Sequence, residues 1–146
     1  MPDSLATITK YQFTPVAPEN APKVWPQVEP LIDRVIQGGD LKHTQRSYHV
    51  LLDILSGINA LWVVHDDKDI IAAIVTRIVN YHLCRRVYVS HIGGHDMVNW
   101  RAMVMEKLDD YARSIGAQAL EGGERKGWAG CGFEITGVNL VRFVNG

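Results

Sequence analysis

The chain has 146 residues, of which 47% are hydrophobic and 21% are charged. This length is typical of one domain, which buries roughly 70% of its unfolded surface on folding, so we expect a single domain over residues 1–146. The 15 basic and 16 acidic residues leave a net charge of −1, which gives no field to hold a polyanion and predicts no nucleic-acid partner. No apolar run reaches the ~20 residues that span a bilayer, so we expect no membrane partner and a cytoplasmic location.

The first third of the chain is predicted to hold a strand and a helix. Residues 7–14 alternate and are rich in Thr and aromatic residues, which is typical of a strand, and the Pro-rich stretch 15–22 is expected to end it. Pro26 and Pro30 limit the start of the helix, because proline is tolerated in the first turn only, and Gly38 closes it. The helix has an apolar stripe formed by Val24, Val28, Leu31, Ile32, Val35 and Ile36.

A second helix is predicted to follow, with Thr44 as its N-cap and Gly57 at its end. Its apolar stripe is formed by Tyr48, Leu51, Leu52 and Leu55. Because both helices are apolar on one side only, each is expected to lie against another layer of the domain.

The middle of the chain predicts a hairpin. Residues 61–64 and 70–79 are apolar, and the acidic stretch 66–69 between them is typical of a tight turn. The two strands should therefore pair antiparallel, and a link at residues 80–85 leads into the next strand.

A βαβ unit is predicted after that link. Residues 87–92 form a strand that stops at Gly93 and Gly94, and residues 117–121 form a second strand. The helix between them ends at Gly116 and has an apolar face formed by Trp100, Val104, Leu108, Tyr111 and Ile115. A crossover of this length makes its two strands parallel.

The C-terminal residues 133–136 and 138–144 are predicted to be two further strands around Gly137. The expected fold class is α/β (α+β), with a mixed, mostly antiparallel sheet, a central parallel βαβ unit and helices on both faces.

Five short motifs follow one another between the hairpin and the C-terminal segment. They are Asn80-Tyr81, Ile92-Gly93-Gly94, Trp100, Arg125-Lys126-Gly127-Trp128 and Gly132-Phe133. Together with the order of the elements, this set resembles the GNAT fold of acetyl-CoA-dependent N-acyltransferases, and most closely the GNAT-like proteins encoded by tailed bacteriophages.

The resemblance implies acetyl-CoA as cofactor. Its pantetheine arm would pair with the backbone of the strand that ends at Ile92, and its pyrophosphate would lie on amides at the start of the following helix, where the helix dipole favours an anion. The residues at the implied positions are Val89, Ser90, Ile92, Gly93, Gly94 and His95, with Arg125 as a further phosphate contact.

The sequence departs from the family at this cofactor loop. Residues 96–99, which begin with Asp96, stand where the family carries Arg or Gln followed by Gly-x-Gly or Gly-x-Ala. A carboxylate beside a pyrophosphate costs about 4 kcal/mol per charge pair at 4 Å and an effective dielectric of 20. A helix dipole returns about 0.3–1 kcal/mol, so the repulsion dominates unless Asp96 points away. Asp96 or Asn99 is also expected to cap the helix.

Catalysis in this family needs a base for the amine, and often a Tyr after the second strand of the βαβ unit, yet no Tyr follows Tyr111. His91 and Glu121 are the candidate catalytic residues, although His91 is equally typical of an edge histidine bonded to backbone. No metal site is predicted, because Gly93 and Gly94 separate His91 from His95 and break the spacing of helical ligands.

Two functions remain open. The first is a phage-type acetyl-CoA-dependent N-acyltransferase with a degenerate cofactor loop, either active on an unidentified amine or without its chemistry. The alternative is a non-catalytic structural or interaction protein, bound to phage structural proteins in a virion or its assembly machinery, and so placed in the host cytoplasm or the virion.

Overall fold

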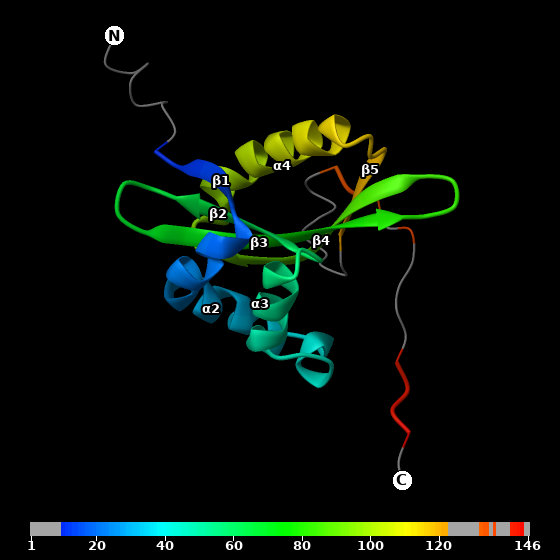
Figure 1. Cartoon of the computed structure of the whole chain (residues 1–146), viewed down its shortest axis with the longest axis horizontal. Coiled ribbons are helices and arrows are strands. Elements are labelled where there is room, and N and C mark those ends of the chain that lie inside the picture. Colours follow the sequence, from blue (N-terminus) through cyan, green and yellow to red (C-terminus); the bar gives the residue numbers. More distant parts are fainter. Residues whose placement is uncertain (1–9, 123–131, 135, 137–140, 145–146) are drawn as a thin grey trace.

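The computed structural model describes residues 10–122, 132–134, 136 and 141–144. Within them, five strands form one sheet in the order β1-β2-β3-β4-β5, with α2 and α3 on one face and α4 on the other (Figure 1). Neighbouring strands are antiparallel except β4 and β5, which are parallel. The predicted fold class is therefore confirmed. The elements are β1 Gln12–Val16, η1 Pro18–Asn20, α2 Ala21–Gln37, η2 Asp40–His43, α3 Ser47–Leu55, β2 Ala60–His65, β3 Ile70–Asn80, β4 Arg85–Gly94, α4 Met97–Ser114 and β5 Ala119–Gly122.

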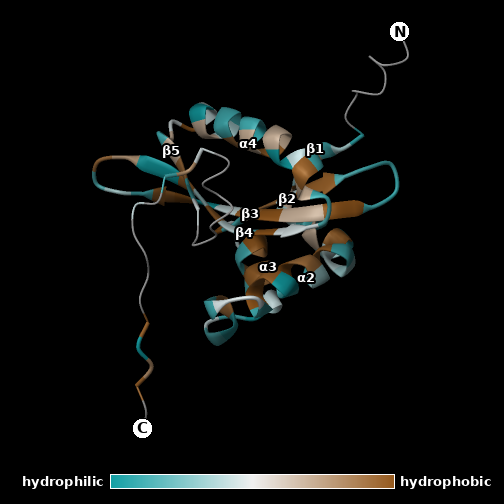
Figure 2. Cartoon of the chain, turned by 180° about the vertical axis from the view of Figure 1, so that it is seen from behind, coloured by the Kyte–Doolittle hydropathy of each residue, from teal (hydrophilic) through white to brown (hydrophobic). Residues whose placement is uncertain are grey.

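The sheet separates two layers of hydrophobic core. On one face, Trp100 and Leu108 of α4 pack with Trp62 of β2. On the other face, Ile32 and Ile36 of α2 are fully buried against the sheet. Figure 2 shows the same division, with hydrophobic residues along the strands and hydrophilic residues on the outer side of α4. Within the described ranges, no helix is long and apolar enough to cross a membrane.

Helix α2 begins earlier than predicted. It starts at Ala21 and contains Pro26 and Pro30 in its interior, so the expectation that these prolines limit its start is wrong. Pro22, Pro26 and Pro30 are four residues apart and exposed, which places them on one solvent-facing side of the helix. Pro22 lies in the first turn, where no intrahelical bond is lost. Pro26 and Pro30 leave the carbonyls four residues before them without their usual N–H donors, and on this side water can take those bonds.

Strand β1 also differs from its prediction. It begins at Gln12, and residues 7–9 lie outside the described part of the chain. It ends at Val16, within the predicted Pro-rich stretch 15–22, after Pro15 has paired with Trp62. A proline is tolerated in an edge strand such as β1, because its missing N–H can lie on the side without a neighbour.

Thr44 does not cap α3. The helix begins at Ser47 after Arg46, and Thr44 lies at the end of η2, where its hydroxyl donates to the Leu41 carbonyl at 3.1 Å. Short hydroxyl side chains also bond to backbone within turns, and this local contact competes with capping.

Most of the predicted apolar stripe of α3 faces outward, although Leu51 packs against the core. Tyr48, Leu52 and Leu55 are 57%, 57% and 44% exposed, whereas Val50 and Ile54 are buried against α2 and the sheet. Because this helix carries apolar residues on more than one side, its periodicity alone does not determine which side is buried.

The hairpin and the βαβ unit are confirmed, with β4 extending through both glycines and β5 at Ala119–Gly122. Gly116 has a φ of +73°, as expected for the residue that ends α4. The two C-terminal strands are not present in the described parts of residues 133–136 and 138–144, and the rest of those segments lies outside the described residues. A strand needs a neighbour to bond to, and residues 141–144 are exposed and pair with no described strand.

Gly93 lets α2 approach the sheet closely. A Cβ atom at this position would lie 2.6 Å from Cγ2 of Val35 and 2.8 Å from the carbonyl oxygen of Leu31. Any side chain at position 93 would therefore push α2 away from β4. This contact gives the glycine a packing role independent of any ligand.

We predict that Gly93→Ala destabilises the fold by about 1–3 kcal/mol, the usual cost of an overpacked core. Gly39→Ala is the matched control, because a Cβ there meets nothing within 4 Å. Urea unfolding of both variants measures the difference. Equal stabilities would show that α2 shifts without cost.

Candidate functional site

A β-bulge in β4 determines which side chains reach the face covered by α2 and α3. Thr76 of β3 pairs with Val89, but the preceding residue, Val75, pairs with His91, so Ser90 is one residue too many. An extra residue reverses the alternation of side chains that follow it. As a result Val89 and Ile92 both lie in the core beneath α4, and His91 lies on the opposite face.

A pocket of about 300 Å³ lies on that face, between the sheet and the segment from η2 to α3. Its lining is mainly polar. The polar side chains in the lining include Gln45, His49, Asp53, Asn59, Ser90 and His91. Its size suits a small molecule.

His91 is buried in this pocket, with 4% of its surface exposed. Its Nε2 lies 2.7 Å from Oε1 of Gln45, and its Nδ1 lies 2.8 Å from Oγ of Ser90. Because Oε1 of Gln45 can only accept, the proton is assigned to Nε2, and Nδ1 then accepts from the Ser90 hydroxyl, whose other acceptor, the Val75 carbonyl, is farther away at 3.3 Å. Ser90 and His91 thus form a hydrogen-bonded pair at the pocket wall.

Two acceptor groups in the pocket lack partners within the described chain. Asn59 is 8% exposed, and its Oδ1 is buried with no hydrogen bond. The Asp53 carboxylate also makes no hydrogen bond to a described residue, while its backbone carbonyl accepts from the Asn59 N–H at 3.0 Å. An unpaired buried acceptor lowers the free energy of unfolding by about 1–3 kcal/mol, so such acceptors are rare in folded proteins unless they have a function.

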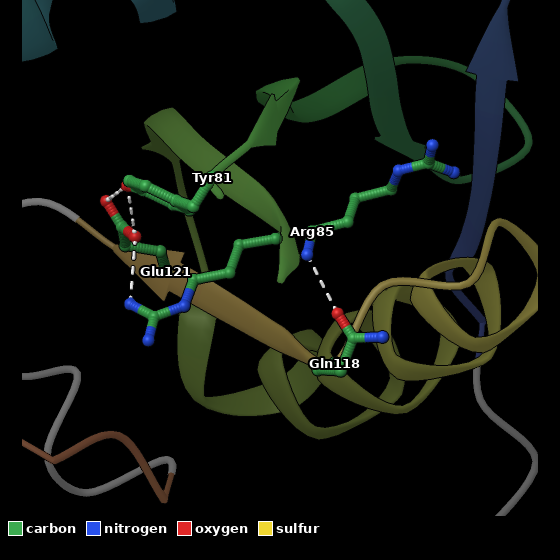
Figure 3. A network of polar contacts seen from close by, with 5 residues as sticks. Tyr81, Arg85, Gln118 and Glu121 are labelled. Atoms are coloured by element: carbon green, nitrogen blue, oxygen red, sulfur yellow. Dashed lines mark hydrogen bonds and ion pairs between the residues drawn. The ribbon is translucent and has the colours of Figure 1, made fainter. Parts of the chain in front are cut away.

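Glu121 lies in a different cluster. Its carboxylate accepts from the Tyr81 hydroxyl at 2.8 and 3.0 Å and from the Arg86 guanidinium at 3.2 Å (Figure 3). The bond to Glu121 raises the pKa of Tyr81 above its usual 10.0. Glu121 is not among the residues that line the pocket, so the structure does not bring the two candidate catalytic residues together.

The same end of the sheet is held by a second set of bonds. The Arg85 N–H donates to Oε1 of Gln118 at 2.8 Å (Figure 3). The Arg85 guanidinium donates to Oδ1 of Asn80, also at 2.8 Å. Both residues of the Asn80-Tyr81 motif therefore help to fasten the β3–β4 turn to the start of β5.

Asp96 occupies the N-cap position of α4 with a left-handed backbone, φ 61°, but its side chain makes no capping bond, so the capping prediction is wrong for Asp96. Its carboxylate instead accepts hydrogen bonds from the Tyr11 hydroxyl and from Nδ2 of Asn99, the latter at 2.7 Å. The start of α4 is thereby tied to the start of β1.

Solved structures with a similar fold include several acetyltransferases. An aminoglycoside acetyltransferase from an uncultured soil metagenomic sample matches with a TM-score of 0.67 and 10% identity over 93% of this chain and 97% of its own. A ribosomal-protein-alanine N-acetyltransferase from Brucella melitensis matches with a TM-score of 0.65 and 12% identity, over 92% of this chain and 99% of its own. Glucosamine-6-phosphate N-acetyltransferase from Arabidopsis thaliana matches with a TM-score of 0.61 and 12% identity, over 92% of this chain and 99% of its own. The chain has the GNAT fold.

This likeness concerns the fold alone at such identities. No family model matches the sequence. No curated protein matches it significantly either.

Two parts of the structure bear differently on acetyl-CoA, the cofactor that the GNAT fold implies. Among the described residues, β5 pairs only with residues 86–89 of β4, so the later backbone at Ser90 and Ile92 is free on that side to bind an extended ligand. This part fits the pantetheine arm.

The pyrophosphate end does not have its usual cradle. The His95 N–H is already bonded to the carbonyl of Ile71 at 3.1 Å, Gly93 is covered by α2, and Asp96 carries a negative charge at the start of α4. Arg125, the remaining predicted contact, lies outside the described residues. The predicted cofactor residues therefore fit one end of the ligand only.

Sequence reasoning missed Gln45, Asp53 and Asn59. No motif marks them, since Gln45 and Asp53 come from the α3 region and Asn59 precedes β2. They meet only when α3 lies over the bulged part of the sheet.

The contact between Tyr11 and Asp96 predicts an acid-dependent stability. The Tyr11 hydroxyl, followed by Asn99, holds the pKa of Asp96 below its usual 3.8, because both donate to the charged carboxylate. A lowered folded-state pKa stabilises the fold above 3.8, and this contribution is lost as pH falls below 3.8 through the lowered value. We expect the stability difference between wild type and Asp96→Ala to be constant near neutral pH and to shrink in that acid range. Chemical unfolding across pH measures it, and a difference that grows in acid would contradict the assignment.

Proposed function

We propose that this chain transfers an acetyl group from acetyl-CoA to the amine of a small acceptor bound in the pocket beneath α3. The observation that carries the proposal is the β-bulge at Ser90, which brings a buried, hydrogen-bonded histidine into a polar pocket, next to β4 backbone that pairs with no described residue of β5. The acetyltransferases of similar fold support it.

Each pocket residue then has a defined part. Acetyl-CoA, when bound, supplies the activated acyl group, and β4 backbone at Ser90 and Ile92 would hold the arm that carries it. The amine gives its proton to Oγ of Ser90 while the Ser90 hydroxyl proton passes to Nδ1 of His91. As the C–N bond of the acetylated amine forms, the thioester C–S bond would break, and the thiolate would leave as the CoA thiol with a proton from solvent. Gln45 keeps His91 in the tautomer that can accept this proton.

A second function is favoured by the start of α4, which has a carboxylate where a pyrophosphate would lie. We propose as the alternative that the chain is of the bacteriophage type, has lost acyl transfer and binds structural proteins of a virion or of its assembly machinery. It would then lie in the host cytoplasm or in the virion. The ordered motifs from Asn80 to Phe133 support this origin.

Thermal unfolding with acetyl-CoA separates the two functions. A ligand at a hundred times its dissociation constant adds about 2.7 kcal/mol to stability, so the enzyme reading predicts a clear rise in melting temperature. Asp96→Asn should strengthen binding, because it removes a like charge near the pyrophosphate. An unchanged melting temperature in both proteins supports the alternative and rejects the enzyme.

We further predict that His91→Gln lowers the rate of acetyl transfer by about 10²-fold or more, the usual loss when a positioned base is removed. Release of the CoA thiol during turnover measures this rate. His43→Gln on the exposed η2 segment is the control. An equal rate in the two variants would exclude His91 as the base.

A further inference from the structure

The two unpaired acceptors of the pocket are linked to each other by backbone. Asn59 is held next to Asp53 by the hydrogen bond from its N–H to the Asp53 carbonyl, at 3.0 Å. Both side chains line the pocket, and neither Oδ1 of Asn59 nor the Asp53 carboxylate has a hydrogen-bond donor among the described residues. A ligand that completes this pair must bring N–H or O–H donors.

The charges of the pocket favour a cation at that pair. Asp53 is the single acidic residue in the lining, and it is partly buried. Arg77 also lines the pocket, but its guanidinium is exposed and lies 5.5 Å from the centre of the Tyr88 ring. Solvent screens a charge at an exposed position more strongly than a charge in a partly buried one. Cationic ligands are therefore attracted to Asp53 more than Arg77 repels them.

The neighbouring polar groups suit hydroxyls. His49 accepts the Arg46 N–H at Nδ1, at 2.9 Å, which leaves its other ring nitrogen as a donor. The side-chain nitrogen of Gln45 is a further donor, because its Oε1 is bound to His91. Hydroxyl groups can accept from these donors and also donate.

We infer that the pocket selects a cationic amine that carries hydroxyl groups, with its ammonium group donating to the Asp53 carboxylate and to Oδ1 of Asn59. That this molecule is the acyl acceptor rests on the proposed function, whereas its binding does not. Oδ1 of Asn59 is turned away from solvent, so its contact with the ammonium group requires a half-turn of the terminal amide. Such amide torsions are broad and have low barriers.

A matched series of six-carbon polyols tests the selectivity. Glucamine carries one ammonium group, sorbitol is its neutral counterpart and gluconate is its anionic one. Calorimetric titration of the full chain without acetyl-CoA should show that glucamine binds about tenfold more tightly than either, as one charge-assisted hydrogen bond provides. Equal binding of the three, tighter binding of gluconate, or no binding of glucamine would overturn the inference.

Variants locate the selectivity. Asp53→Asn and Asn59→Leu should each weaken glucamine binding about tenfold or more. Glu29→Gln is the control, because Oε2 of Glu29 is likewise buried without a partner but lies on α2 outside the pocket lining. Glucamine affinity unchanged in Asn59→Leu would overturn the inference.

Stability distinguishes a binding role from a structural one. A leucine at position 59 removes the unpaired acceptor at similar volume, so the unliganded variant should unfold at the same or a higher temperature than wild type. If the variant has a lower melting temperature and its glucamine binding weakens to the same degree, Asn59 stabilises the fold and does not bind the ligand. Acetyl-CoA is titrated in a separate experiment. If glucamine binds and acetyl-CoA does not, acyl transfer is rejected and the hydroxylated amine remains as the ligand class. If acetyl-CoA binds and glucamine does not, only the ligand class is rejected.

Discussion

Strand β4 has one residue more than the stretch of β3 with which it pairs, and the chemistry of this protein depends on that residue. If regular alternation continued through Ser90, His91 would lie on the same face as Val89, in the hydrophobic core beneath α4. The bulge instead places an imidazole and a hydroxyl side by side at the wall of a polar pocket. A single backbone irregularity thus converts a core strand into one wall of a binding site.

The opposite wall depends on how closely the helical layer approaches. Gly93 admits α2 onto β4, and α3 follows with Asp53 on its pocket side and Gln45 just before its first residue. The end of β4 is therefore used for packing, and the start of α4 is tied to Tyr11 through Asp96. Together these contacts leave the polar pocket well formed while the usual place for a pyrophosphate is occupied by a carboxylate. The fold is that of GNAT proteins, and the start of α4 carries a carboxylate.

Sequence patterns predicted the hairpin, the βαβ unit and α4, because each has a strong local signal such as the apolar face that ends at Gly116. They failed for α3, where apolar residues occur on several sides, and for the interior prolines of α2, whose exposure decides their cost. The bulge at Ser90 depends on the register between two strands, which no local pattern encodes. Asn59 is a candidate because its buried Oδ1 has no hydrogen-bond partner among the described residues, and no sequence pattern shows this.

Backbone hydrogen exchange in β4 with and without saturating acetyl-CoA tests the central claim most directly. If the free edge at the bulge holds the acyl-bearing arm, the amides of Ser90 and Ile92 exchange more slowly when acetyl-CoA is present, while those of β1 are unchanged. Exchange at Ser90 and Ile92 that is the same in both conditions would contradict the account.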